Sequence, residues 1–277
     1  MFTLNCKGKI LKFDAPIAMG IINATPDSFY KNNRQTNIDE ALFVAEKMLK
    51  DGATILDIGG QSTRPGSEMI SVDEELKRVI PIIESVHQKF PKTIISIDTF
   101  QSQVAKLAVD AGALMVNDIS GGNLDEEMFL TVAKLKVPYI CMHIKGTPQN
   151  MQSNTYYDNV VGEIKNYFID KITLAEKVGI DNIILDIGFG FAKTTEQNFE
   201  LLKNLKEFQS LQKPMLIGIS RKSSIYKSLE ITAEEALNGT TVLNTIGILN
   251  GANILRVHDV KEAVEVIKLS RYFFNGR

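Results

Sequence analysis

The chain has 277 residues, and its hydrophobic content of 44% is ordinary for one soluble domain with a large core. Its 31 basic and 33 acidic residues nearly cancel, and no basic stripe or block of like charges indicates a nucleic-acid partner or a disordered tail. No apolar run approaches the roughly 20 residues that span a bilayer, and the basic N-terminus does not resemble a signal sequence. These features predict a cytoplasmic protein that binds neither nucleic acid nor a membrane.

The first 16 residues form a segment of their own. Apolar and polar residues alternate over residues 1–13, and Lys7-Gly8-Lys9 supplies a turn between the two halves. This pattern predicts a short N-terminal β-hairpin over residues 1–16, and we expect it to cover the bottom of a barrel.

Eight short apolar runs follow, each dense in Ile, Val, Leu and Met and each ending in a polar cluster. They lack polar alternation, which is typical of strands buried on both faces. The runs with their polar ends are 18–29, 55–66, 94–101, 114–122, 139–152, 183–194, 215–224 and 253–260. A segment long enough for a helix lies between successive runs, so the pattern predicts an α/β protein with a single (β/α)8 TIM barrel, one domain over 1–277. The chemistry of such a barrel sits at the carboxyl ends of its strands.

Local signals mark the helix starts and the loops. Capping-box spacing links Asn37 with Glu40, Ser71 with Glu74, Thr194 with Gln197, and Thr232 with Glu235. Most connections are short, but those at 24–37, 59–71 and 143–156 are long. Long loops at the catalytic face of a barrel are typical of functional lids.

Acidic and amide side chains end three of the runs. Asp98 and Asp186 each follow a run of Ile and Leu directly, and Asn117 ends a third. A carboxylate in a partly desolvated pocket needs hydrogen-bond donors, so this set suits a heterocycle with an amino-pyrimidinone edge. The alternative is that each Asp caps the following helix, which explains one residue more easily than all three.

Cationic side chains follow three other strands. Thr63 and Arg64 follow the second strand, Lys222 lies in Ser-Arg-Lys-Ser after the seventh, and Arg256 and His258 flank the end of the eighth. Barrels frequently bind phosphate with the loops after strands 7 and 8, and arginine grips phosphate oxygens bidentately. Each of these residues alone is compatible with an ordinary surface charge or a structural histidine.

The cysteines do not indicate a disulfide, and the sequence contains only a weak signal for a metal site. Cys6 and Cys141 are far apart, which predicts free thiols in a reducing compartment. No cluster has zinc spacing. Mg²⁺ often binds through phosphate oxygens and one or two protein oxygens, so Asn23, at the end of the first strand, suffices as its protein ligand.

Eight motifs in order resemble the dihydropteroate synthase family of pterin-binding enzymes. They are NATPDSF (23–29), GGQSTRPG (59–66), IDT (97–99), VNDISGG (116–122), MHIKGTPQNMQ (142–152), DIGFGFAK (186–193), SRKS (220–223) and RVHDV (256–260). The resemblance implies a transferase of folate biosynthesis that joins 6-hydroxymethyl-7,8-dihydropterin diphosphate to p-aminobenzoate, giving 7,8-dihydropteroate and diphosphate. It also implies Mg²⁺, a homodimer and a sulfonamide target.

The family's functional residues can be carried over position by position. The matching pterin positions are Asp98, Asn117, Met142, Asp186, Gly218 and Lys222. The matching diphosphate positions are Asn23, Thr63, Arg64, Arg256 and His258, with Asn23 also the Mg²⁺ position. The p-aminobenzoate positions are Phe29, Pro65, Phe191, Lys222 and Ser223. The resemblance assigns the reaction itself to Asn23, Arg64, Lys222, Arg256 and His258.

Several positions depart from the family pattern. The stretch Tyr30–Asn33 stands where the family often has Ser-Asp-Gly-Gly, and Gln61 where Glu is usual. Gln101, Ile187 and Ala192 replace a frequent Lys, Pro and Gly. None of these removes an assigned residue, so the departures concern the loops.

Three other functions compete with the synthase. A pterin-binding methyltransferase-type barrel shares the acidic and amide strand ends, but its ligand carries no diphosphate and does not need the cationic set. A catalytically inactive homologue is disfavoured because the assigned residues are all present. A phosphate-binding isomerase barrel is disfavoured because no general base is evident.

Overall fold

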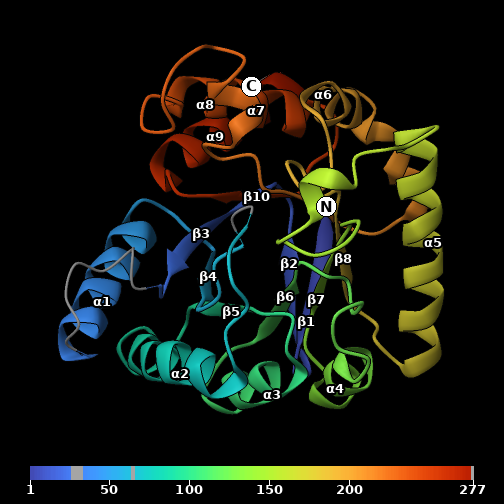
Figure 1. Cartoon of the computed structure of the whole chain (residues 1–277). Helices are drawn as coiled ribbons and strands as arrows, with labels where there is room; N and C mark the ends of the chain where they lie inside the picture. The colour runs from blue at the N-terminus through green and yellow to red at the C-terminus, as the bar shows by residue number, and fades with distance from the viewer. Residues whose placement is uncertain (26–33, 64–65, 276–277) are drawn as a thin grey trace.

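The computed structural model of the protein describes residues 1–25, 34–63 and 66–275. A closed parallel barrel forms its centre, with the strands in the order β10-β3-β4-β5-β6-β7-β8-β9 (Figure 1). The strands are β3 (Ile17–Asn23), β4 (Ile55–Gly59), β5 (Ile94–Asp98), β6 (Met115–Asp118), β7 (Tyr139–Met142), β8 (Ile183–Asp186), β9 (Met215–Ile217) and β10 (Ile254–Val257). The predicted (β/α)8 barrel is confirmed, with one strand from each of the eight apolar runs.

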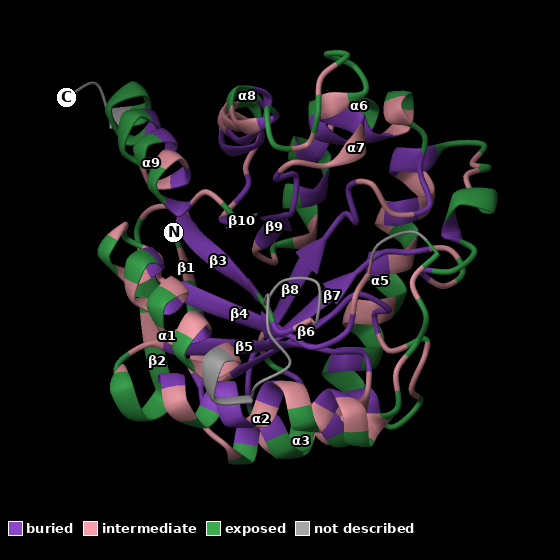
Figure 2. Cartoon of the chain, turned by 60° about the vertical axis from the view of Figure 1, so that its left-hand side comes forward, coloured by how far each residue is buried: buried purple, intermediate pink, exposed green. Residues whose placement is uncertain are grey.

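Helices surround the barrel, so the strands are buried and the outer helix faces are exposed (Figure 2). The helices are α1 (Arg34–Lys50), α2 (Val72–Lys89), α3 (Ser102–Asp110), α4 (Met128–Leu135), α5 (Val160–Val178), α6 (Thr195–Lys203), α7 (Ser223–Tyr226), α8 (Leu237–Leu249) and α9 (Val260–Asn275). Two 3₁₀ helices, η1 (Met151–Ser153) and η2 (Leu205–Leu211), complete the connections.

Two of the four predicted helix caps are present. Ser71 accepts a hydrogen bond from the Glu74 backbone, and Thr194 forms a full capping box with Gln197. The prediction at Asn37 is wrong. At Thr232 the Glu235 carboxylate accepts from the Thr232 backbone N–H at 2.9 Å and from its hydroxyl at 3.0 Å, as the spacing predicts, but no helix begins there. Asn37 lies inside α1, because the helix already begins at Arg34, and α8 begins at Leu237, after the turn that follows Thr232. A capping-box pattern does not by itself place the first helical turn.

The N-terminal hairpin is also confirmed. β1 (Phe2–Cys6) pairs antiparallel with β2 (Lys9–Phe13) across the turn at Lys7 and Gly8, whose φ angles of 52° and 89° are left-handed. Leu4 and Cys6 pack onto the barrel's lower layer, which includes residues such as Met19 and Ile55. The hairpin therefore closes the barrel at the end opposite the site.

Strand register places the functional strand ends at one level. Gly59 of β4 lies beside Asp98 of β5, and Asp98 lies beside Asn117 of β6. Across the barrel, Met142 of β7 lies beside Asp186 of β8. Parallel strands that end together point their last side chains into one space at the barrel mouth.

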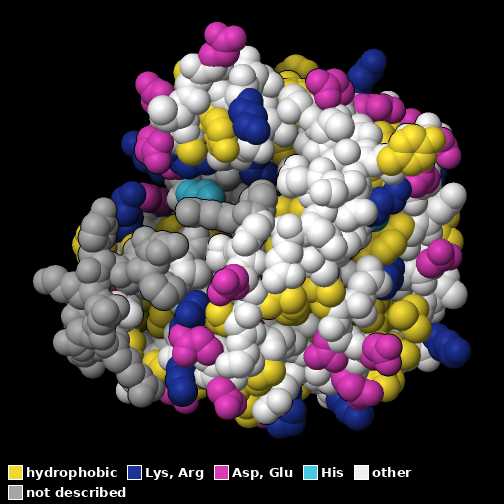
Figure 3. Space-filling view, viewed as in Figure 1, with side chains coloured by type: hydrophobic (Ala, Val, Ile, Leu, Met, Phe, Trp, Pro, Cys, Tyr) yellow, Lys and Arg dark blue, Asp and Glu magenta, His cyan; other side chains and the backbone are white. Residues whose placement is uncertain are grey.

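The surface is electrostatically mixed. Figure 3 shows acidic and basic side chains interspersed over one face, in keeping with the balanced composition. Over the described part of the chain, no helix combines the length and apolar character needed to cross a membrane.

Candidate active site

An ion network occupies the barrel mouth. The Arg256 guanidinium donates from Nε to Asp57 Oδ2 at 2.6 Å and from Nη2 to Asp98 Oδ2 at 2.5 Å. Asn117 Nδ2 donates to the same Asp57 oxygen at 3.0 Å. Asp57 is fully buried and the side chain of Arg256 is only 20% exposed, so these charges interact in a poorly solvated space. Two predicted ligand-binding residues, Arg256 and Asn117, thus meet on the Asp57 carboxylate, and Arg256 links them to a third, Asp98.

Asp98 titrates near neutrality in this network. Burial raises its pKa to about 7, Arg256 opposes that rise, and the negative charge of Asp57 adds to it. Burial therefore disfavours the ionised form of Asp98, whereas Arg256 and any ligand that donates N–H groups to it favour that form.

The charges of Asp186 and Lys222 influence each other on the opposite side of the mouth. Burial raises the pKa of Asp186, while the Lys222 charge and a hydrogen bond from the Gly188 backbone at 2.8 Å oppose the shift. Burial lowers the pKa of Lys222 to about 8, with Arg256 adding to the decrease and Asp186 opposing it. Lys222 also donates to the Phe189 carbonyl. Its ammonium is thus oriented between the Asp186 carboxylate and the loop after β8.

An apolar wall lines the same region. Met142, Met151 and Ile144 belong to one buried cluster, against which the partly buried Phe191 packs. Lys222 Nζ lies 4.4 Å from the centre of the Phe191 ring. Gly218 is close to both cationic groups, since a Cβ built there lies 3.9 Å from Lys222 Nζ and from carbons of Arg256. A flat ligand fits between such a wall and the charged groups.

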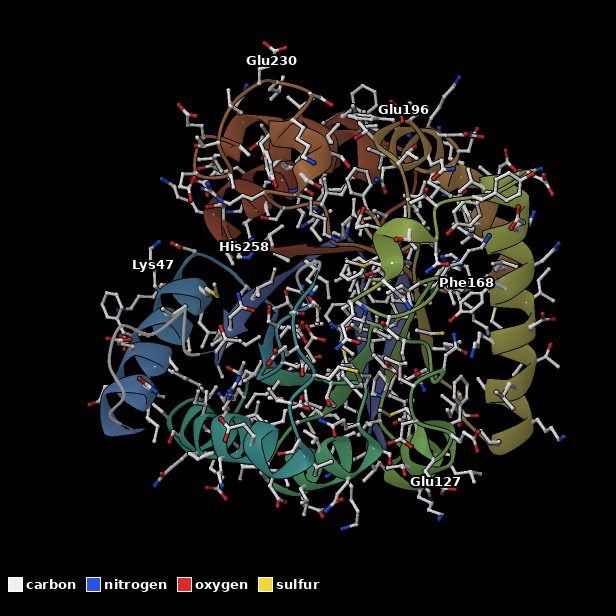
Figure 4. The ribbon with its side chains drawn as sticks, in the orientation of Figure 1. Lys47, Glu127, Phe168, Glu196, Glu230 and His258 are labelled. Atoms are coloured by element: carbon white, nitrogen blue, oxygen red, sulfur yellow. The ribbon has the colours of Figure 1, made fainter. Side chains whose placement is uncertain are left out.

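His258 stands at the outer edge of the site, at the end of β10 (Figure 4). Ser220 Oγ lies 3.0 Å from His258 Nδ1 and also accepts from the His258 backbone N–H at 3.2 Å. Ser220 Oγ therefore contacts both the ring and the backbone of His258 and fixes the orientation of the imidazole. Partial desolvation and the charge of Arg256 lower the pKa of His258 below its usual range, so the ring is neutral at pH 7.

The residues flanking Lys222 have different environments. Ser223 is the first residue of α7, beside the site. Arg221 pairs with Asp259, from Nε to Oδ2 at 2.8 Å and from Nη2 to Oδ1 at 3.0 Å. It also donates to the carbonyls of Ala233 and Glu234. Lys222, rather than its neighbour Arg221, is the cation of this loop that reaches the site.

A buried lysine holds the loop after β8, and the sequence analysis did not identify it. Lys193 Nζ lies 2.9 Å from the Phe191 carbonyl, 3.0 Å from the Gly188 carbonyl and 3.1 Å from His143 Nδ1. Burial and the Lys193 charge lower the pKa of His143 to about 2, so its ring is neutral and accepts at Nδ1. The three nearer acceptors suffice for the three protons of an ammonium group, and the His143 carbonyl lies farther away at 3.5 Å. Lys193 therefore sets the shape of the loop that carries Phe191.

The remaining predicted residues lie at the rim or outside the described residues. Asn23 is exposed at the end of β3, and Thr63 is partly buried in the loop after β4. Arg64, Pro65 and Phe29 lie outside the described residues, as does the departing stretch at 30–33.

The donor set around Asn23 suits a weakly held hard cation. No group of three or more His, Cys, Asp or Glu residues with metal-binding geometry occurs in the ranges that the structure describes. Within those ranges the Asn23 amide has no hydrogen-bond partner, so its oxygen is available. An exposed amide oxygen at a mouth that suits an anion fits Mg²⁺, which keeps several waters and shares phosphate oxygens.

Asp57 was missed because its signal is shared with ordinary strands. It stands in the middle of the run Ile55–Gly59, two residues before the polar strand end that marks a functional position in a barrel. A charged residue inside a fully apolar strand is a usable signal, since such a group is rarely buried without a partner. Lys193 carries the weaker signal, because a lysine after a Gly-Phe-Gly-Phe loop is indistinguishable from a surface charge.

Comparison with known proteins identifies the family. The family model described as "Pterin binding enzyme" matches residues 19–258. The dihydropteroate synthase of Synechocystis is 46% identical over 255 residues, covering 91% of this chain and 88% of that protein. The structure of the Yersinia pestis dihydropteroate synthase in a sulfonamide drug complex superposes with a TM-score of 0.92 at 37% identity, covering 100% of both chains. That of Xanthomonas albilineans with 4-aminobenzoic acid has a TM-score of 0.91 at 37% identity, covering 98% of both.

The Lys193 arrangement makes a direct prediction about stability. Replacing Lys193 with Met leaves the Phe191 carbonyl without its donor and the Gly188 carbonyl with only the Phe191 backbone N–H at 3.0 Å, which we expect to lower the free energy of unfolding by about 1–3 kcal/mol. Urea unfolding monitored by circular dichroism measures this. The control Lys203→Met, at an exposed position of α6, should change stability by less than about 0.5 kcal/mol. Equal stability of the two variants would contradict the role assigned to Lys193.

Proposed function

The chain belongs to the dihydropteroate synthases of the pterin-binding enzyme family, which are transferases, and we propose that it joins 6-hydroxymethyl-7,8-dihydropterin diphosphate to p-aminobenzoate. One observation carries the proposal for this chain. Two buried carboxylates and an amide that suit a pterin lie in the same barrel mouth as the cations that suit a diphosphate. A methyltransferase-type ligand has no diphosphate, so those cations would have no anion to bind.

The acidic and amide side chains suit recognition of the pterin. Its amino-pyrimidinone edge presents adjacent N–H donors, which match carboxylates such as Asp186 and Asp98 and the amide of Asn117. Met142 and Gly218 complete the walls, and the Lys222 ammonium is oriented to donate to the pterin carbonyl oxygen. The buried carboxylates and the amide find hydrogen-bond partners only when a ligand presents such N–H donors. The site therefore discriminates against ligands that lack these donors.

The cations suit departure of the diphosphate. In the proposed dissociative route the bond from the methylene carbon to the diphosphate oxygen breaks first, and the electron pair leaves with the diphosphate. The electron-rich pterin stabilises the resulting cation, so no covalent protein nucleophile is needed. Arg256 and His258 stabilise the leaving charge, and the anion raises the pKa of the neutral His258 so that the ring takes up a proton. Arg64 and Thr63 are assigned to the same anion by the family resemblance alone.

The second substrate suits the apolar side of the mouth. The p-aminobenzoate ring fits beside Phe191, with Ser223 at the start of α7 and Lys222 nearby. Its aniline nitrogen attacks the methylene carbon, forms the C–N bond and releases a proton to solvent. The Xanthomonas albilineans relative with bound 4-aminobenzoic acid supports this substrate, and the Yersinia pestis relative supports sulfonamides as inhibitors. Phe29 and Pro65 are assigned here by the family resemblance.

The activity is tested directly with the purified protein. With the dihydropterin diphosphate, Mg²⁺ and labelled p-aminobenzoate, we expect labelled dihydropteroate and one equivalent of diphosphate. Lys222→Met should reduce the rate by at least about 100-fold, the scale of one lost charged contact in a transition state. A protein that binds the pterin but forms no product would refute the proposal and favour an inactive homologue. Absence of any diphosphate release or pterin exchange without p-aminobenzoate would refute the dissociative route alone.

Magnesium is the proposed cofactor, with Asn23 as its one described protein ligand. When bound, it would neutralise charge on the diphosphate oxygens. We expect chelation by EDTA to abolish turnover and Asn23→Ala to raise the Mg²⁺ concentration that gives half-maximal activity. Isothermal titration of diphosphate binding with and without Mg²⁺ gives a second readout. An Mg²⁺ requirement unchanged in Asn23→Ala would contradict this assignment.

The exposed apolar side chains of the last helices favour a homodimer. On α9, Tyr272 and Phe273 follow Leu269 by three and four residues, and the three side chains are 65–73% exposed. Val242 of the adjacent α8 is 49% exposed. A contiguous apolar helix face of this kind is typical of an interface. We also propose a cytoplasmic location, which is supported by two buried thiols that form no disulfide.

Sedimentation velocity tests the dimer. We expect the protein to sediment as a dimer at micromolar concentration and the double variant Leu269→Asp/Phe273→Asp to sediment as a monomer, because buried unpaired carboxylates oppose association. Phe43→Asp, at a residue of α1 that is 72% exposed, is the matched control and should remain dimeric. If Phe43→Asp dissociates and the α9 variant does not, the interface lies elsewhere.

A further inference from the structure

Asp57 has no ligand-binding role in the family assignment, yet it is the most buried charged group of the site. Its carboxylate is 0% exposed, and two donors share its Oδ2 atom, Arg256 Nε at 2.6 Å and Asn117 Nδ2 at 3.0 Å. Among the described residues its second oxygen, Oδ1, has no hydrogen-bond partner. A buried carboxylate oxygen without a donor is costly, so this vacancy calls for an explanation.

The Arg256 guanidinium is placed to fill that vacancy. Its Nε and Nη2 protons lie on one edge of the planar group, the edge that grips a single carboxylate through both oxygens. Here this edge is divided between two carboxylates, with Nε on Asp57 and Nη2 on Asp98. In Arg221 of the same protein, Nε and Nη2 instead donate to the two oxygens of a single carboxylate, that of Asp259.

A pterin and Arg256 compete for the same acceptor. Under the proposed function Asp98 accepts N–H groups of the pterin, but in this structure its Oδ2 already accepts from Arg256 at 2.5 Å. A pterin N–H group directed at this oxygen competes with Arg256 for it and weakens the Arg256 contact. An arginine N–H group without an acceptor in a poorly solvated pocket carries a large desolvation cost. Another acceptor must therefore replace Asp98 as the partner of this N–H group.

We propose that Asp57 is a positioning residue that retains Arg256 when the pterin displaces it from Asp98, the guanidinium closing onto both oxygens of Asp57. This inference rests on the proposed function. The closed pair keeps the cation at the barrel mouth, and the remaining N–H groups of Arg256 are free to face the diphosphate. Asp57 also fixes the direction of the Asn117 amide through the same Oδ2 atom.

The charges around Asp98 give the sign of the expected pH effect. The groups that face it are Arg256 of β10, Asp57 of β4, Glu75 of α2, Asp118 of β6, and the Asp186 and Lys222 pair across the mouth. A pterin donates to the ionised form of Asp98, so its affinity should rise with pH through the pKa of that group. Removing the Asp57 charge lowers this pKa, because a negative neighbour is lost and Arg256 pairs with Asp98 alone.

The variant Asp57→Asn tests the role, since it removes the charge with little change in shape. The probe is 6-hydroxymethyl-7,8-dihydropterin, which lacks the diphosphate, and its binding is measured by calorimetry from pH 5.5 to pH 8. At pH 8 we expect affinity to fall by about tenfold, the scale of one charge-assisted hydrogen bond. The pH at which pterin affinity is half of its maximum, on the acid side of the profile, should move to a lower value. A merely structural defect would weaken binding without moving that pH in this direction.

A double-mutant cycle with Arg256→Met isolates the competition. Without Arg256 no cation competes for Asp98, so adding Asp57→Asn should change pterin affinity by less than about twofold. The double variant is charge-balanced, which protects folding, and circular dichroism and thermal unfolding verify this for each protein. If Asp57→Asn weakens pterin binding equally in both backgrounds, Asp57 does not act through Arg256 and the inference is overturned.

A matched control and the wild-type enzyme separate the outcomes. Asp259→Asn removes one carboxylate from Arg221, which stays held by the Ala233 and Glu234 carbonyls, and should leave affinity and pH midpoint unchanged. A wild type that binds pterin but makes no dihydropteroate overturns the proposed function and leaves this inference standing. An active wild type whose Asp57→Asn variant keeps both the affinity and the midpoint overturns this inference alone.

Discussion

The buried ion network of Asp57, Arg256 and Asp98 is the constraint on which the rest of the site depends. Charges in a poorly solvated space are tolerated only when paired, and these three are paired through one guanidinium. Asn117 is oriented by the Asp57 carboxylate, and the pKa of Asp98 is raised mainly by burial, with Arg256 opposing the rise and Asp57 adding to it. The network therefore stabilises the charges at the barrel mouth. It also contains a carboxyl group, Asp98, whose pKa responds to a ligand that donates hydrogen bonds to it.

The loops are held by a different device. The loop after β8 is built around the Lys193 ammonium, which bonds to backbone carbonyls and a neutral imidazole rather than to a carboxylate. Such an arrangement leaves Asp186 and the Phe189 carbonyl to interact with Lys222. One lysine thus shapes the loop while the other is presented to the site. Burial lowers the pKa of both lysines, and that of Lys193 the more strongly, so the role of each is decided by the groups around it.

The opposite ends of the barrel divide stability and chemistry. The hairpin β1–β2 closes the lower end with Leu4 and Cys6 packed against a purely apolar layer. At the upper end the polar strand ends converge, because the parallel register brings Gly59, Asp98 and Asn117 to one level. A (β/α)8 barrel tolerates this concentration of charge at its mouth because the apolar layers below supply the core.

The sequence by itself determined the features that depend on neighbouring residues. Apolar runs, their polar ends, the hairpin turn at Gly8 and the cap at Thr194 all follow from local periodicity and backbone preference, and the order of the motifs identified the family. The capping pattern at Asn37 gave a wrong helix start, because local spacing does not exclude an earlier one.

Only the tertiary structure decided which charges pair. Arg256 meets Asp57, 199 residues away, because the closing barrel places β10 next to β3 and near β4, and Lys193 meets His143, 50 residues away, because β7 and β8 are neighbours. Such partners are set by barrel closure and strand register, which no local pattern encodes.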